Sequence, residues 1–257
     1  MKRVFLFLTC MLWFFPAMMH AYTFSPSVMT LASSGNNSSG LFSMSNPEDR
    51  IIPIDITVYE LTKDIDGKPV RGKEVIDYFI IYPSQFFLKP KEKRSVQIRW
   101  IGDPSIPYER AFTIFCREVP LPKKERKEKK QNGMTASINV LIHYAGRVYV
   151  APRNARPDIV IDSVETRKNE SGQPELVIIC MNKGTGRGNL LKAKFIVTPV
   201  GSGKGGARKG ASVELAREDI PGAASSIFVN GLRRFVIPWP RDLPFGPVKV
   251  VLKREND

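Results

Sequence analysis

Residues 134–152 contain the residue types that indicate a specific interaction chemistry. Ile138, Val140 and Ile142 occupy alternate positions, so in an extended chain these β-branched side chains form one apolar row. Tyr144 extends this row. A strand of this kind suits the middle of an ordinary β-sandwich, and it equally suits a strand that pairs with a partner chain.

The residues before this strand favour the second possibility. Residues 123–133, KKERKEKKQNG, are too polar to bury and predict a solvated loop, which places the strand where an edge strand would be. Proteins normally blunt an exposed edge that carries large apolar side chains with charge or proline, unless the edge pairs with a partner. We therefore hypothesise that this strand pairs with another chain and completes its fold.

Catalytic and metal chemistry find little support in the sequence. There is no GxSxG or HExxH motif, and GSGKGGARKG lacks the GK[ST] ending of a phosphate loop, so we predict neither an enzyme nor a cofactor. Downstream of the leader described below, His143 is the one histidine and no close cysteine pair exists, so no metal site is predicted. Cys116 and Cys180 fall in different predicted domains, which favours two separate buried thiols, although an oxidising compartment would permit a bridge.

The basic composition does not indicate nucleic-acid binding. The net charge is +14, and removing Lys2 and Arg3 with the leader leaves +12. The charge is spread over loops at 123–130 and 204–209, without the interleaved aromatic side chains on which bases stack. We interpret it as favouring solubility or attraction to acidic partners.

The first residues predict an export leader. Residues 1–21 combine a basic start, an apolar run over 4–15 and a small residue at Ala21, a pattern typical of a secretory signal and too short for a membrane span. We expect cleavage after Ala21, no stable membrane insertion, and a mature chain long enough for two domains.

Alternating apolar residues predict β-structure along the mature chain. Residues 52–61 alternate with an inward set of Ile52, Ile54, Ile56 and Val58, and similar short runs follow, with turn residues and no helical periodicity between them. This pattern predicts an antiparallel sandwich over residues 22–152 and a second sandwich of the same class over 153–257.

Several segments, in this order and spacing, resemble the PapD-like periplasmic pilus chaperones of chaperone/usher pathways. The matching segments are SNPEDRIIPIDITVYE, FIIYPSQFFLKPKEKRSVQIRW, ERAFTIFCREVPLP and GRVYVAP. The resemblance implies an all-β chain of two immunoglobulin-like domains at an angle, with a cleft between them. It also implies a periplasmic chaperone of pilus biogenesis. Such a chaperone completes unfinished pilus or fimbrial subunits with its own strand and delivers them to an outer-membrane usher.

The resemblance also implies roles for particular residues. The strand residues that would insert into the subunit, here called the donor row, fall on Ile138, Val140 and Ile142, with Tyr144 beside them. Arg147 falls at the position where a basic residue of the family binds the subunit's C-terminal carboxylate. The family's second basic residue, on the first strand, falls near Thr30, where this chain has no basic residue, and Arg153 is a candidate replacement.

A charged network between the domains is a further implication of the resemblance. Its acids fall on Glu109 and Asp242, while its arginine falls on Ala151. Surface carboxylates without such a role remain the alternative for these two acids. The alternative for the whole chain is a secreted two-domain immunoglobulin-like structural or adhesive surface protein that keeps its strand within its own fold.

Overall fold

The computed structural model describes residues 22–120, 141–200 and 212–254. In these residues the structure consists of strands and three single-turn 3-10 helices, with no α-helix. No helix in this part of the chain has the length and apolar character needed to cross a membrane. The predicted leader, 1–21, and two members of the predicted donor row, Ile138 and Val140, lie outside the described residues.

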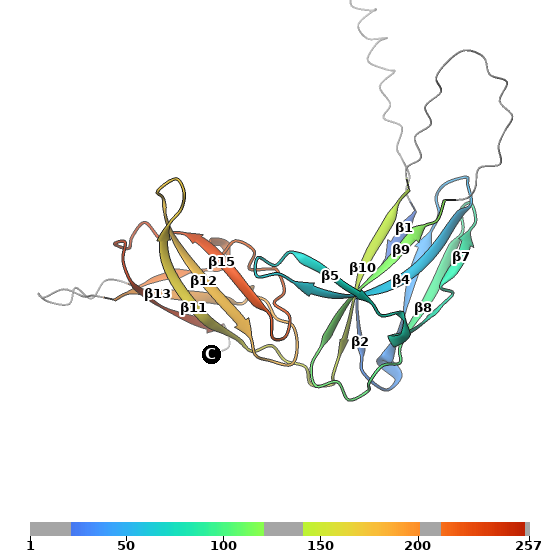
Figure 1. Cartoon of the computed structure of the whole chain (residues 1–257), viewed down its shortest axis with the longest axis horizontal. Coiled ribbons are helices and arrows are strands. Elements are labelled where there is room, and N and C mark those ends of the chain that lie inside the picture. The colour runs from blue at the N-terminus through green and yellow to red at the C-terminus, as the bar shows by residue number, and fades with distance from the viewer. Residues whose placement is uncertain (1–21, 121–140, 201–211, 255–257) are drawn as a thin grey trace, which may run out of the picture.

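Two packed sheets form the first domain (Figure 1). One has the strand order β1-β3-β8-β6, and the other has the order β2-β10-β9-β4-β5, with β7 also paired to β4. The elements are β1 (Thr23–Ser25), β2 (Val28–Ala32), η1 (Asn36–Ser38), β3 (Ser39–Ser45), β4 (Ile52–Lys63), β5 (Pro69–Glu74), η2 (Ile76–Tyr78), β6 (Phe79–Tyr82), β7 (Gln85–Leu88), β8 (Lys93–Trp100), β9 (Arg110–Glu118) and β10 (His143–Ala151).

The first core forms where the inward rows of both sheets meet. The predicted inward set of β4 is confirmed, because Ile52, Ile54, Ile56 and Val58 are all buried. They pack with alternate residues of β8 and β9, and each row arises because successive strand side chains point to opposite faces.

One pairing in the first domain differs from the predicted antiparallel sandwich. The chain passes from β1 in one sheet to β2 in the other across a cis peptide bond at Ser25–Pro26, and β2 then runs parallel to β10. Alternation of apolar residues predicts where strands lie, but it carries no information about the direction of a neighbouring strand.

The second domain has two three-stranded sheets, β11-β12-β15 and β14-β13-β16. Its core is separate from the first and runs from Ile159 to Leu243 in sequence. The elements are β11 (Ile159–Lys168), β12 (Pro174–Asn182), β13 (Ala193–Pro199), β14 (Val213–Leu215), η3 (Arg217–Asp219), β15 (Leu232–Pro238) and β16 (Val248–Arg254).

The two cores confirm the predicted class of two all-β immunoglobulin-like sandwiches. Cys116 belongs to the first core and Cys180 to the second, and both are buried free thiols, as predicted. Burial raises the pKa of each thiol to about 12, so both stay protonated and unreactive at neutral pH.

Candidate functional site

Strand β10 has neighbours on both sides over part of its length. In its downstream half, residues 147–151, Arg147 pairs with Thr113 of β9 on one side and with Val28 of β2 on the other. Its upstream half, residues 143–146, pairs with β9, and no second strand among the described residues flanks it. An unflanked edge presents N–H and C=O groups to which another chain can pair. The upstream half therefore has the edge that the sequence predicts.

The described members of the predicted donor row lie against the first core. Ile142 and Tyr144 are partly buried there. The Tyr22 hydroxyl donates a hydrogen bond shared between the carbonyls of Cys116, at 2.9 Å, and Ile142, at 3.0 Å, and its ring meets that of Tyr144 at 4.5 Å. Burial raises the pKa of both tyrosines, which keeps them neutral. This part of the row therefore packs on its own domain while its backbone edge stays unflanked.

Arg147 points to the opposite face of the sheet from this row. Its backbone N–H donates to the carbonyl of Ser27 at 2.8 Å, while its side chain is exposed and has no ion pair among the described residues. Tyr149, two residues further along the same face, meets Phe228 of the second domain with ring centroids 6.0 Å apart. Arg147 thus lies on the face that turns towards the second domain.

Arg187 of the second domain connects Glu109 and Thr30. Its Nη1 lies 2.5 Å from Glu109 Oε2, its Nη2 donates to Thr30 Oγ1 at 3.1 Å, and its guanidinium lies 3.7 Å from the centre of the Tyr149 ring. Burial raises the pKa of Glu109, and the charge of Arg187 opposes that shift. A cation from the second domain therefore stands beside Thr30, where the resemblance places a basic residue of the first strand.

Arg187 was not predicted from the sequence, and Asp242, the other acid predicted for a charged network between the domains, is not at the junction. Asp242 is exposed and follows β15 at the end where Pro238 pairs with Glu175, whereas the other end of β15 lies at the junction. The structure thus brings Glu109 into a contact between the domains but does not bring Asp242 to it. Arg153 shares a shallow hollow with Ala151 and these junction residues, and it has no ion pair among the described residues. The signal that sequence reasoning overlooked is an arginine within the glycine-rich turn KGTGRGN.

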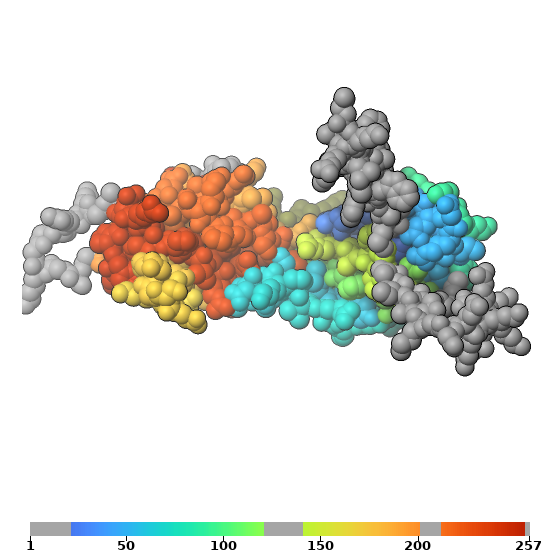
Figure 2. All heavy atoms as spheres, turned by 90° about the horizontal axis from the view of Figure 1, so that it is seen from above, coloured from blue at the N-terminus to red at the C-terminus, as the bar shows by residue number. Residues whose placement is uncertain are grey.

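The hairpin of β4 and β5 reaches across to the second domain, and both views show it lying against that domain (Figures 1 and 2). Lys63 Nζ donates to Ser225 Oγ at 3.0 Å and to the Ser226 carbonyl at 2.8 Å. At the hairpin turn, Arg234 binds both oxygens of Asp66, at 2.9 and 2.8 Å, and its backbone N–H donates to the Ile65 carbonyl at 2.7 Å. The hairpin is therefore a physical link between the domains.

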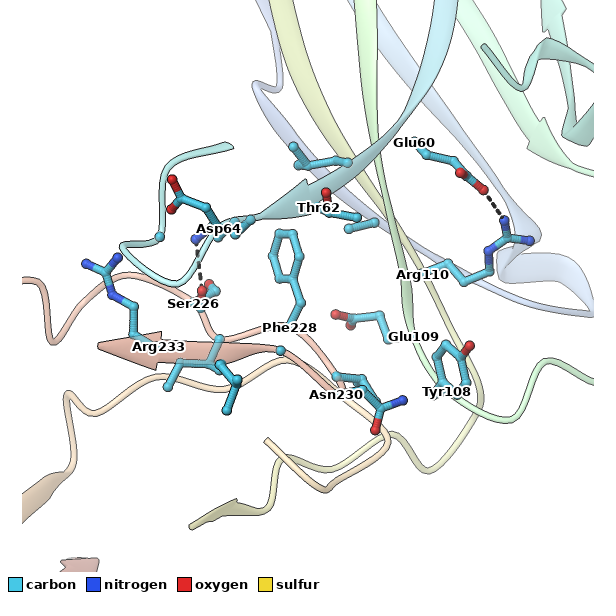
Figure 3. Close-up of a pocket in the computed structure, with 18 of the residues that line it drawn as sticks. Glu60, Thr62, Asp64, Tyr108, Glu109, Arg110, Ser226, Phe228, Asn230 and Arg233 are labelled. Atoms are coloured by element: carbon cyan, nitrogen blue, oxygen red, sulfur yellow. Dashed lines mark hydrogen bonds and ion pairs between the residues drawn. The ribbon is translucent and has the colours of Figure 1, made fainter. Parts of the chain in front are cut away.

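A cavity of about 630 Å³ lies at this junction (Figure 3). Side chains of β4, of the segment before β9 and of the segment 226–233 line it. Figure 3 shows Phe228 projecting between the hairpin and Glu109, and Arg233 beside the hairpin turn. The cavity therefore has an apolar centre with charged groups around it.

The described residues contain no cluster of three or more histidine, cysteine or carboxylate side chains that would hold a metal ion. The features of interest are instead the edge of β10 at residues 143–146, which no second described strand flanks, and the exposed side chains of Arg147 and Arg153, which have no ion pair among the described residues. Such an arrangement suits binding of a peptide segment through its backbone and of an anionic group through its charge.

Comparison with known proteins supports the fold. No protein-family model matches the chain, and no curated protein matches it. Among solved structures, the class 5 fimbriae chaperone CfaA is 14% identical, with a TM-score of 0.54 over 91% of this chain and 99% of that chain. A structure from a chaperone–tip adhesin complex of CFA/I fimbriae biogenesis gives a TM-score of 0.53 at 14% identity, with the same coverage. The predicted resemblance to pilus chaperones is thus confirmed at the level of the fold.

Proposed function

We propose that this protein is a periplasmic chaperone that binds pilus or fimbrial subunits by donor-strand complementation and delivers them to an outer-membrane usher. The observation that supports the proposal best is the unflanked upstream half of β10, directly followed by the exposed guanidinium of Arg147. The solved structures with the same fold bear the names of a fimbriae chaperone and of a chaperone bound to a tip adhesin. The predicted leader and the net positive charge suit an exported protein that binds partners.

In this proposal the strand edge supplies backbone hydrogen bonds and the row Ile138, Val140 and Ile142 fills the client's core. Burying three such side chains contributes roughly 1.5–3 kcal/mol each, or about 5–9 kcal/mol together. Association costs about 4–15 kcal/mol. Because the two ranges overlap, side-chain burial leaves little net affinity by itself, and in this proposal Arg147 supplies a second attachment by binding the client's terminal carboxylate bidentately.

A second candidate function is a two-domain structural or adhesive surface protein that keeps β10 within its own fold. The observation in its favour is that Ile142 and Tyr144 pack on the first core and that Tyr22 bonds the Ile142 carbonyl. The two candidates differ in whether the strand's row is used by another chain.

The deciding experiment is co-expression in the periplasm with subunits encoded by adjacent reading frames, followed by a protease-protection assay. Val140→Asp places a charge in the row and is expected to abolish protection of the subunit, whereas Val140→Ile keeps a β-branched apolar side chain and is expected to preserve it. Arg147→Ala is expected to remove about 1.5–3 kcal/mol of client binding.

Arg99→Ala is the matched control, because Arg99 is likewise exposed but lies on β8 in the other sheet. Thermal unfolding of each purified variant checks that the chain itself stays folded. If Val140→Asp and Arg147→Ala are folded and still protect subunits as the wild-type chain does, the donor-strand proposal is wrong. Recovery of the chain in assembled surface material, without co-purified subunits, would favour the structural alternative.

A further inference from the structure

The core of the second domain is open along one side. A groove of about 450 Å³ lies there between β11 and β16, and each of these strands has a neighbour on one side only within residues 141–200 and 212–254. Ile161, Val250 and Leu252 pack on the core from these strands but are only partly buried. Phe195 and Val197, their counterparts in the flanked strand β13, are fully buried. A further strand over the groove would therefore remove more apolar surface from water.

Of the two edges that border the groove, β16 is the one open to pairing. The register of β11 is irregular between Ile161 and Ser163, and its Ile159 carbonyl accepts a hydrogen bond from Arg254 Nη2 at 2.8 Å. Such irregularities and side chains blunt an edge. In contrast, β16 pairs with β13 in an unbroken register from Val248 to Arg254. Its other edge therefore presents a regular row of N–H and C=O groups.

The outer face of this sheet indicates the charge of a strand that would pair there. Lys253 of β16 lies opposite Lys194 of β13, and Lys194 is already paired with Glu214 of β14 on its other side. Lys253 and Lys249 are exposed, and neither has an ion pair among the described residues. Opposite charges on neighbouring strands stabilise a sheet, so acidic side chains beside these two lysines would complete the charge pattern.

The same lysines argue against a second copy of this chain as the occupant. If two β16 strands paired in antiparallel fashion about Val251, Lys249 of each strand would lie opposite Lys253 of the other. Like charges directly opposite each other destabilise a pair of strands. The charge of the edge therefore favours an acidic segment of a different protein.

We infer that β16 is a second strand-binding edge of this protein, which binds an extended acidic segment of a partner protein. Because successive side chains point to opposite faces, the segment carries acids opposite Lys249 and Lys253 and apolar side chains opposite Val250 and Leu252. The apolar side chains enter the groove, while the backbone supplies the hydrogen bonds of an added strand. This edge belongs to the second domain and does not include β10, so the inference goes beyond the proposed function and does not rest on it.

A peptide with this pattern tests the inference on the purified, client-free chain. The labelled peptide Ser-Glu-Val-Thr-Val-Glu-Ser is titrated into the chain, and its fluorescence anisotropy is followed. We expect saturable binding, and slower hydrogen exchange of backbone amides between Lys249 and Lys253 with no change in β10. The peptide Ser-Lys-Val-Thr-Val-Lys-Ser keeps the apolar row and reverses the charges. It is expected to bind roughly 10-fold more weakly, because two favourable cross-strand pairs are replaced by repulsive ones.

A charge swap separates recognition from a folding defect. The double variant Lys249→Glu with Lys253→Glu is expected to reverse the preference, so that it binds the lysine peptide and loses the glutamate peptide. A gain of binding cannot arise from a chain that fails to fold. The matched control is Lys93→Glu with Arg99→Glu, at exposed positions of β8 in the first domain. This control is expected to leave the binding of both peptides unchanged.

Reversal of the preference in the double variant, together with slower exchange in β16, supports the inference. Equal binding of the two peptides to the wild-type chain, or the same preference in the double variant, overturns it. Absence of binding by a monomeric chain would mean that the lysines only blunt the edge against unwanted pairing, which also overturns the inference. Sedimentation that detects a dimer with protected β16 amides would assign the edge to a second copy instead.

Discussion

In the downstream half of β10, Val148 and Val150 are fully buried and strands flank the backbone on both sides. The upstream half has one flanking strand among the described residues, and Tyr144 is partly buried. One continuous strand therefore combines a fixed part, which the first domain needs for its own core, with a part whose edge is open to pairing. Under the proposed function, this difference would let the domain pair its upstream half with a client and keep its own fold.

The most direct test of the difference between the two regions is to place the same charge in each and to compare the stability of the variants. Val150→Asp buries an unpaired carboxylate in the first core and is expected to cost about 4 kcal/mol or more of the free energy of unfolding. Val140→Asp, in the predicted donor row, is expected to change that free energy by within about 0.5 kcal/mol. Urea denaturation measures both. Equal, large losses in the two variants would mean that the row belongs to the protein's own core.

The strands of the first domain were easier to predict from the sequence than the contacts between the two domains. Alternation along one strand is a local pattern, so the strands and the inward set from Ile52 to Val58 were predictable. Arg147 followed from the resemblance, and in the structure its side chain is exposed. The contact of Arg187 with Glu109 joins residues 78 positions apart in different domains, and no local pattern signals such a contact. The same reason explains why the resemblance placed Asp242 in one network with Glu109, whereas in the structure Asp242 is exposed away from the junction.

Gly146 marks the boundary between the two halves and allows a second test. A Cβ atom there would lie 2.6 Å from Phe24 Cε1 and 3.0 Å from Ile114 Cγ2. Gly146→Ala is therefore expected to lower the free energy of unfolding by about 1–3 kcal/mol through overpacking. Gly246→Ala is the control, because a Cβ at Gly246 meets nothing within 4 Å. Equal stability of the two variants in urea denaturation would contradict the close packing at the boundary.

Tyr22 gives a smaller effect that is confined to the upstream half. Tyr22→Phe removes the hydroxyl that bonds the carbonyls of Ile142 and Cys116, at an expected cost of about 1 kcal/mol. Hydrogen exchange should become faster at Glu118, whose N–H faces the Ile142 carbonyl, by more than at Val148 in the downstream half. Equal acceleration at both positions would show that the two halves open together.

Tyr22 also predicts a dependence on alkaline pH. Burial raises its pKa above the ordinary value of 10.0, so the unfolded chain ionises this group first. The contribution of the neutral hydroxyl to stability is complete below pH 10 and falls as the pH rises beyond it. Over that range the wild-type chain is expected to lose more free energy of unfolding than Tyr22→Phe. Parallel pH profiles of the two proteins would contradict this assignment.

The smallest expected effect concerns the hairpin turn, which touches neither half of β10. Asp66→Asn weakens the contact with Arg234, and because this ion pair is exposed we expect little change in the unfolding of either domain. Small-angle scattering should instead detect a wider distribution of distances between the domains. The hydrogen bonds from Arg234 hold the pKa of Asp66 below its ordinary value of 3.8. In the wild-type chain the contact with Arg234 is therefore complete above pH 3.8, and it is lost as the pH falls through the lowered pKa. An unchanged distribution of distances in Asp66→Asn would contradict the assignment of this contact as a restraint on the two domains.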